Sequence, residues 1–204
     1  WNPALPASYQ PASMPLAVTA SNVRGAAEQK AHRAAHRHVN TDLDRGAVAG
    51  REWYVRLSVS APAAKLEDAG NLLGQLADAK TGVDAHDLPE LPPPPFGPFL
   101  SIVFPHPEWG QIDADYGTDY HPVRAGKDAW TFEVRSNDPG RFLVLSWQGP
   151  MAILTRSTLV DRATGKTLPA VKGNYRIGAL GGSSRTFEWR YNGSSIGTRA
   201  IDPQ

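Results

Sequence analysis

The stretch AWTFEVRSNDPGRFLVLSW (129–147) decides the fold class of this chain. Apolar and polar residues alternate through AWTFEVRS (129–136), so that Trp130 and Phe132 share a face, because successive side chains of a β-strand point to opposite faces. SNDPG (136–140) follows with Asn, Asp, Pro and Gly, the residues that tight turns require. We therefore predict two antiparallel strands joined by a hairpin turn.

The same period of two recurs on both sides of this stretch. In SRTFEWRY (184–191) the aromatic residues alternate with Thr, Glu and Arg, which predicts one dry face and one face in contact with water. Residues 161–166 and 180–184 carry further turn chemistry and predict two more hairpins. In all, we predict strands over residues 53–60, 99–104, 129–136, 141–148, 153–160, 174–179 and 184–191.

About seven short strands without intervening long helices predict an all-β fold. The pattern is typical of an antiparallel immunoglobulin- or fibronectin-like β-sandwich, here over residues 51–192. Residues 68–98 lie between the first two predicted strands as a Pro-rich insert, and four prolines at 92–95 predict a polyproline II segment. Because loops of this length are uncommon, we expect this one to be ordered for a purpose.

The two ends of the chain have a different composition. Residues 1–50 are predicted to form an extended arm, since four prolines within the first 15 residues favour extended backbone. Within this arm, residues 22–38 are rich in Ala, Arg and Lys, which predicts a short basic helix. Residues 193–204 are predicted to be a tail. An arm of this kind seldom orders itself, so we expect it to bind a partner. The candidate contact residues in the arm are Trp1, Tyr9, Arg33 and Arg37.

Composition narrows the possible functions. The 204 residues include 21 basic and 20 acidic side chains, a net charge of +1, so no global field attracts nucleic acid, and we expect no nucleic-acid partner. There is no cysteine, which excludes disulfides and thiolate metal sites. No apolar run reaches the ~20 residues of a membrane-spanning helix. The chain begins with Trp1, and a removed signal peptide would explain this start, so we expect an extracytoplasmic location (secreted, cell surface or periplasmic).

Residues 53–191 resemble a known family. The order WYVRLSV, DAGNLLGQLADAKTGVDAHDLPELPPPP, LSIVFPHPEWG, AWTFEVRSNDPGRFLVLSW, LVDRATGK and SRTFEWRY is similar to a β-sandwich module at the C-terminal ends of large secreted bacterial surface proteins. The most specific parts are Asn71 to Gly74, the run from Asp84 and Asp87 to the prolines, and the segment from Val134 to Trp147. The resemblance implies an extracellular module with an assembly or anchoring role, and it implies no catalytic residues.

Two groups of oxygen ligands are candidate calcium sites. Asp113, Asp115 and Asp119 flank Gly117, and alternate acidic side chains around a tight turn suit a hard cation, although the closing Glu of a full calcium loop is missing. The alternative is a turn whose carboxylates cap backbone amides. The second candidate group is Asn71, Asp84 and Asp87. Apart from this possible Ca²⁺, we expect no cofactor.

A pair of histidines in the predicted helix is a candidate metal or haem site. His32 and His36 are four residues apart and would share one helix face, as metal ligands do. No carboxylate lies between them, so the zinc metalloprotease pattern is absent. The alternative is a basic helix that faces solvent or a partner.

Three aromatic residues, Trp109, Tyr116 and Tyr120, fall in a segment rich in Gly, Pro and Asp. Such rings stack on sugars or anchor a protein partner. In the alternative interpretation they close one end of the sandwich. No nucleophile elbow or comparable catalytic motif occurs in the sequence, and we expect no enzyme activity.

Three functions remain. The leading hypothesis is a non-catalytic structural or accessory subunit of an exported or cell-surface assembly, which binds other protein subunits, alike or different, through the arm and the sandwich edges. The second is a carbohydrate-binding module that uses the loop aromatics to hold glycans. The third is an extracytoplasmic subunit that carries haem or a metal.

Overall fold

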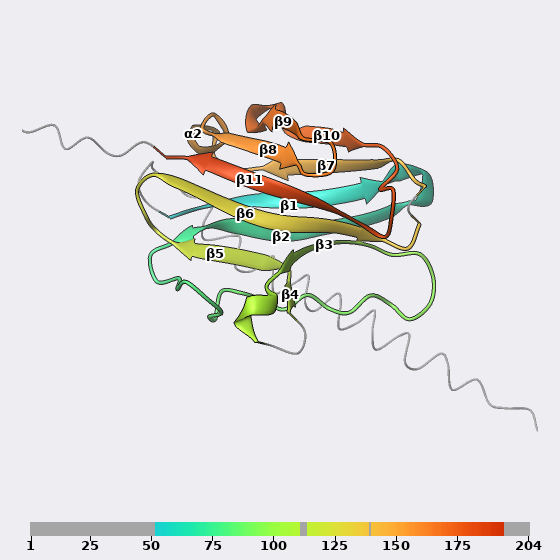
Figure 1. Cartoon of the computed structure of the whole chain (residues 1–204), viewed down its shortest axis with the longest axis horizontal. Coiled ribbons are helices and arrows are strands. Elements are labelled where there is room, and N and C mark those ends of the chain that lie inside the picture. The colour runs from blue at the N-terminus through green and yellow to red at the C-terminus, as the bar shows by residue number, and fades with distance from the viewer. Residues whose placement is uncertain (1–51, 111–113, 139, 194–204) are drawn as a thin grey trace, which may run out of the picture.

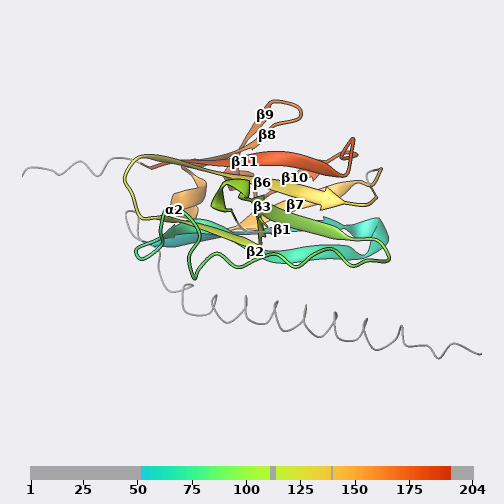
Figure 2. The ribbon, with the colours of Figure 1, turned by 60° about the horizontal axis from the view of Figure 1, so that its bottom comes forward.

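The strands of this chain build two β-sheets that lie one above the other (Figures 1 and 2). The structure is a computed structural model, and it describes residues 52–110, 114–138 and 140–193. Figure 2 shows the layers edge-on, with β11 in the upper layer and β1 and β2 in the lower. The prediction of an all-β fold with two facing sheets is therefore confirmed.

The lower sheet has five strands in the order β10-β7-β1-β2-β5. Its neighbours pair antiparallel except β2 and β5, which are parallel. The strands are β1 (Trp53–Ala61), β2 (Leu66–Leu76), β5 (Thr118–Pro122), β7 (Leu143–Gln148) and β10 (Asn174–Ile177).

The upper sheet has six strands in the order β4-β3-β6-β11-β8-β9, all paired antiparallel. These are β3 (Leu100–Pro105), β4 (Asp115–Tyr116), β6 (Lys127–Ser136), β8 (Ser157–Asp161), β9 (Lys166–Pro169) and β11 (Ser184–Asn192). Short helical turns connect some strands: η1 (Pro62–Ala64), η2 (Pro107–Trp109), α2 (Met151–Leu154) and η3 (Ala170–Lys172).

Large aromatic side chains fill the space between the sheets. Trp53 of β1 meets Trp130 of β6 edge to face, with ring centroids 5.3 Å apart, and also packs on Tyr191 of β11. Trp189 and Phe187 of β11 are fully buried beside them. The alternation predicted for β6 and β11 is therefore confirmed, since their aromatic side chains face the core.

The predicted insert at 68–98 is wrong in its first part, because residues 66–76 form β2. Gly70 is the extra residue of a bulge opposite Leu57 and Ser58, and its φ of 102° is a conformation that favours glycine. Gly74 lies where β1 and β2 approach closely, and an added Cβ would lie 2.1 Å from the carbonyl oxygen of Trp53. These glycines hid the strand in the sequence, since glycine is also typical of loops.

Two of the three predicted hairpins are wrong. β6 and β7 flank residues 136–140, and β10 and β11 flank residues 180–184, but in each case the two strands belong to different sheets. Their connections cross between the layers, and turn residues serve a crossing as well as they serve a hairpin. The turn at 161–166 does join the antiparallel neighbours β8 and β9, as predicted.

The predicted strand at 153–160 is also corrected. Its first residues belong to α2, which follows Pro150, and the strand begins only at Ser157. The sequence interpretation also missed β4, β5 and β9, which have two, five and four residues. No helix among the described residues is long and apolar enough to cross a membrane.

Candidate functional site

The most distinctive polar cluster lies where the edges of the two sheets meet. Asp119 and His121 are two residues apart on β5, so they share one face of that strand. Parallel pairing with β2 places His121 beside Gln75, and His106 immediately precedes η2. Asp128 belongs to β6 of the other sheet.

These side chains form a continuous chain of charges, here called the histidine–aspartate network (Glu108, His106, Asp119, His121, Asp128 and Arg124). His106 contacts Glu108 through Nδ1 at 2.7 Å and Asp119 through Nε2 at 3.2 Å. His121 contacts Asp119 through Nε2 at 3.5 Å and Asp128 through Nδ1 at 2.9 Å. Each imidazole therefore lies between two carboxylates.

Asp128 is the most strongly held member of the network. Its buried carboxylate accepts hydrogen bonds from Gln75 Nε2 at 2.8 Å and Arg124 Nε at 3.0 Å, besides the His121 contact. Burial works against its ionisation, but the hydrogen bonds from His121, Arg124 and Gln75 outweigh burial and hold the pKa of Asp128 far below its usual range. Gln75 Oε1 in turn accepts a hydrogen bond from Trp53 Nε1 at 3.2 Å, which ties this carboxylate to the core.

Aromatic rings support both histidines. The His106 ring stacks on Trp109, with centroids 3.7 Å apart and planes 3° apart, and the His121 ring stacks on Trp130 at 4.7 Å. Burial disfavours the charged form of His106, but the adjacent Asp119 and then Glu108 outweigh it and raise the pKa of this imidazole above its ordinary value. The network therefore favours a protonated His106.

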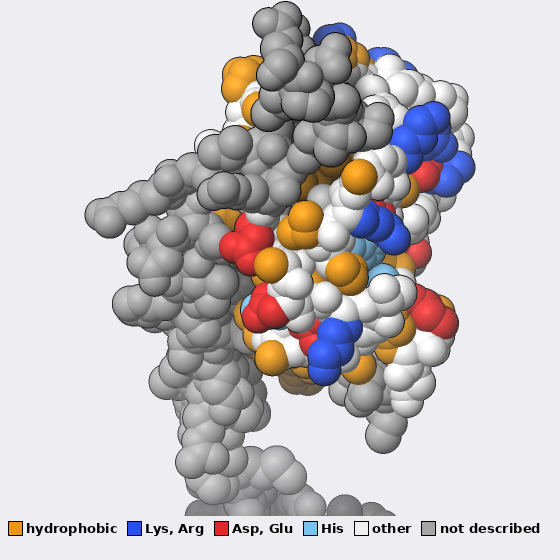
Figure 3. Space-filling model, turned by 90° about the vertical axis from the view of Figure 1, so that its left-hand side faces the viewer, with side chains coloured by type: hydrophobic (Ala, Val, Ile, Leu, Met, Phe, Trp, Pro, Cys, Tyr) orange, Lys and Arg blue, Asp and Glu red, His pale blue; other side chains and the backbone are white. Residues whose placement is uncertain are grey.

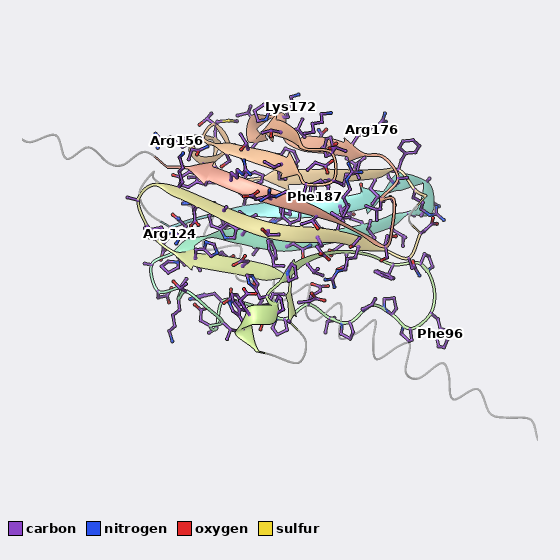
Figure 4. All side chains as sticks on the ribbon, in the orientation of Figure 1. Phe96, Arg124, Arg156, Lys172, Arg176 and Phe187 are labelled. Carbon is purple, nitrogen blue, oxygen red and sulfur yellow. The ribbon has the colours of Figure 1, made fainter. Side chains whose placement is uncertain are left out.

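An open groove of about 620 Å³ lies beside the network and shares Arg124 and Asp128 with it. The antiparallel strands β6 and β11 form its floor. Figure 4 labels Arg124 at this end of the sandwich, and Figure 3 shows Lys and Arg side chains on this end, interspersed with acidic and hydrophobic ones. The complete lining is Arg124, Lys127, Asp128, Ala129, Glu188, Arg190, Tyr191 and Asn192.

In the second candidate calcium group, the carboxylates of Asp84 and Asp87 accept hydrogen bonds from the backbone. Asp84 accepts hydrogen bonds from the backbone N–H groups of Lys80 and His86, at 2.7 Å each. Asp87 accepts one from the backbone N–H of Asp84 at 2.9 Å, and its burial raises its pKa to about 6 despite this bond. Asn71 donates to Asp68. The geometry is that of carboxylates that cap backbone amides.

The first candidate calcium group is divided between different partners. Asp115 forms an ion pair with Arg135, whereas Asp119 belongs to the histidine–aspartate network. Asp113 lies outside the described residues. Within residues 52–110, 114–138 and 140–193, no three His, Asp or Glu side chains are arranged to hold a metal ion.

The side chains of Trp109, Tyr116 and Tyr120 are packed against the protein rather than exposed to solvent. Tyr116 and Tyr120 are only 2% and 3% exposed, and Trp109 is partly buried between His106 and Tyr116. Tyr120 points away from the network into a small cluster with Tyr54 and Leu72 on the other face of the lower sheet. These positions favour the alternative in which the rings close the end of the sandwich.

Several predicted features lie outside the described residues: the arm, its helix at 22–38, and the candidate residues Trp1, Tyr9, Arg33, Arg37, His32 and His36. The predicted tail lies outside them from residue 194 onward.

The sequence interpretation missed His106, His121 and Asp128. One local signal was present, since Asp119 and His121 in DYHP (119–122) have the spacing of side chains on one face of a strand. Nothing local connects them with Asp128, because that contact depends on the pairing of β5 with β2 and on the packing of the two sheets. Comparisons with protein-family models, curated proteins and solved structures give no match.

Proposed function

We propose that this chain is a non-catalytic structural or accessory subunit of an exported or cell-surface protein assembly. The observation that carries the proposal is the exposure of two aromatic side chains at the end of the sandwich away from Arg124. Phe96 is 80% exposed and Phe142 is 75% exposed. Figure 4 shows Phe96 at the far end from Arg124, on the outer edge of the Pro-rich loop. Exposed aromatic side chains of this size are typical of protein contact sites.

The loop that carries Phe96 is held in place. Asn137, in the connection between β6 and β7, accepts a hydrogen bond from the Phe99 backbone N–H at 2.9 Å and donates one to the Gly97 carbonyl at 2.8 Å. Phe142 belongs to the same connection as Asn137. Because Asn137 ties the two loops together, both phenylalanines lie at this end of the sandwich, and fixing the Pro-rich loop in advance lowers the entropic cost of binding.

The sheet edges offer less to a partner than this surface. The edge strands β4, β9, β10 and β5 have two, four, four and five residues, and β9 and β5 both end in proline. Short edges that contain proline disfavour the addition of a strand from another chain. We therefore place the main contact of the sandwich at the Phe96 surface (Phe96 and Phe142) and expect the arm to provide a second contact.

The histidines support a structural role for the polar network. Within the histidine–aspartate network, His106 contacts Asp119 and His121 contacts Asp128. Such pairs orient an edge of the sandwich. We also propose that the sandwich is of immunoglobulin or fibronectin type, since two facing sheets of mainly antiparallel strands enclose a tryptophan-rich core, although the parallel pairing of β2 and β5 departs from a purely antiparallel sandwich.

A cross-linking experiment tests the proposal. A photoreactive phenylalanine analogue replaces Phe96 in the full chain, produced in the cells that make the protein. The same analogue at Val83, which is 41% exposed and lies earlier in the connection between β2 and β3, serves as the control. We expect cross-links to another protein subunit from position 96 and few from position 83. Equal cross-linking from both positions, or none from position 96, would refute the proposed contact surface.

A further inference from the structure

The groove at the Arg124 end has a charge pattern that the proposed assembly does not explain. Its lining contains three basic side chains, those of Arg124, Lys127 and Arg190. Arg156 lies at its border, because the backbone N–H of Asn192 donates to the Arg156 carbonyl at 2.9 Å. Figure 4 labels Arg124 and Arg156 on the same side of the molecule.

The two carboxylates of the groove are already neutralised by arginines. Asp128 pairs with Arg124, and Glu188 pairs with Arg190 at 3.0 Å and with Arg162. Lys127 and Arg156 are exposed and have no ion-pair partner among the residues that the structure describes. The groove and its border therefore carry two uncompensated positive charges, Lys127 in the lining and Arg156 beside it.

The position of Lys127 is fixed by the sheet. It lies directly opposite Asn192 in the antiparallel pairing of β6 and β11, and Ala129 lies opposite Arg190 one step further along the same face. Side chains two residues apart on a strand lie roughly 7 Å apart along it. Lys127 and the Asn192 amide therefore lie side by side across the two strands, and Arg190 lies one step along β11 on the same face, a spacing that suits a ligand with charge at repeated positions.

The lining also indicates the class of the ligand. Apart from Ala129 and the buried Tyr191 ring, the side chains of the groove are charged or polar. Protein contact sites are typically built around an apolar, aromatic centre, and single-stranded nucleic acid stacks its bases on exposed rings. This groove lacks both features among its described lining residues, but it offers charge-assisted hydrogen bonds to a hydrated polyanion.

We propose that the groove over β6 and β11 binds an acidic polysaccharide through Lys127 and Arg190 of its lining and Arg156 at its border. The proposal is independent of the Phe96 surface, which lies at the other end of the sandwich. The bound groups are oxyanions, either the carboxylates of a uronic acid polymer or the sulfates of a sulfated one. Arg124 lies at the edge of the groove and is held in place by Asp128.

Calorimetric titration of the full chain tests the site. The probes are polygalacturonate for carboxylate, dextran sulfate for sulfate, and unmodified dextran as the neutral control. We expect the chain to bind one of the charged polymers and not dextran. Binding to neither charged polymer would overturn the proposal, and the polymer that binds identifies the oxyanion.

Substitutions locate the site. We expect the double variant K127Q/R156Q to bind the charged polymer about tenfold more weakly, as the loss of two charge-assisted contacts implies. The matched control K65Q/R176Q removes the same charge from two exposed cations outside the groove, and Figure 4 labels Arg176 toward the other end of the sandwich. Unchanged melting temperatures in both variants verify folding, and an equal loss of binding in both would overturn the proposal.

Nucleic acid is the competing polyanion. A single-stranded oligonucleotide of matched charge, titrated under the same salt conditions, is expected to bind more weakly than the preferred polysaccharide. Tighter binding of the oligonucleotide, weakened by K127Q/R156Q, would replace the polysaccharide by nucleic acid and overturn the proposed ligand class.

Discussion

Replacement of Asp128 by Asn should destabilise the fold far more than the loss of an ordinary surface ion pair. The Asp128 carboxylate accepts hydrogen bonds at Oδ2 from Gln75 and Arg124, and at Oδ1 from His121 and from the backbone N–H of Ala129. An asparagine amide keeps one acceptor oxygen and turns the other position into a donor. In either orientation at least two donors then face another donor.

The magnitude follows from those contacts. Two lost hydrogen bonds to a buried charged group correspond to about 3 kcal/mol of unfolding free energy, and removal of one partner of a fully buried ion pair costs about 3–5 kcal/mol. Arg124 is 48% exposed, and water screens its part of the interaction, so we expect a loss of about 3 kcal/mol. The matched control is Asp115→Asn, because Asp115 and its partner Arg135 are 37% and 31% exposed. We expect the control to lose less than about 1 kcal/mol.

Urea unfolding of the full chain, followed by tryptophan fluorescence, measures both variants, with equal slopes as evidence that only stability has changed. The pH dependence provides a second check. Because the folded pKa of Asp128 is depressed, its contribution is present above the unfolded value of 3.8 and is lost as the pH falls toward the folded pKa. A loss in D128N no larger than that in D115N would refute the interpretation of Asp128 as the carboxylate that fixes the edge of the sandwich.

Three further predictions concern other parts of the chain. Gly74→Ala should lower the free energy of unfolding by about 3 kcal/mol, because the added Cβ would lie 2.1 Å from the backbone oxygen of Trp53. The control is Gly140→Ala, whose added Cβ would have no atom within 4 Å. It should change the free energy of unfolding by less than about 0.5 kcal/mol in the same urea titrations. The folded pKa of His106 is raised, so its stabilising contribution is present below the unfolded pKa and is lost at higher pH. Between about pH 6 and pH 8 the unfolding free energy of the His106→Gln variant should therefore fall less than that of the unaltered chain. An equal fall in both proteins would contradict this. Deletion of residues 1–50 should leave a domain with an unchanged cooperative unfolding transition but without the ability to join its assembly, as measured by co-isolation; normal assembly of the shortened chain would contradict the role of the arm.

The parts of the fold that could be predicted are those with an uninterrupted local pattern. Alternation alone located β1, β6 and β11, because each places aromatic or branched side chains on one face. β2 was missed because Gly70 and Gly74 serve a bulge and a close approach of strands, and neither role can be distinguished locally from a loop. The sheet to which each strand belongs could not be predicted either. The turn sequence SNDPG at 136–140 is compatible with a hairpin within one sheet and with a connection between the two sheets.

The candidate site could be predicted less well than the fold. Asp119 was identified, but as a calcium ligand, because nearby acids in the sequence suggested an oxygen cage. Its actual neighbours His106 and His121 come from separate segments, and only the packing of η2 and β5 brings all three together. A basic groove built from the start of β6 and the end of β11 is likewise invisible in a chain whose net charge is +1. Local charge clusters depend on strand register, whereas the net charge of the chain does not show where its charged residues lie in space.

Asp128 connects the stability of the sandwich with the charge of the groove, so one substitution should act on both in opposite directions. In D128N the network loses its most strongly held carboxylate, and the free energy of unfolding falls. The same change removes one of the two negative charges from the groove lining and leaves Arg124 without its counterion. An acidic polysaccharide should therefore bind the folded variant more tightly than the unaltered chain, at a temperature well below the melting point of both. Weaker binding by a fully folded D128N would mean that Asp128 positions Arg124 for the ligand, and that its orienting role outweighs the charge it contributes.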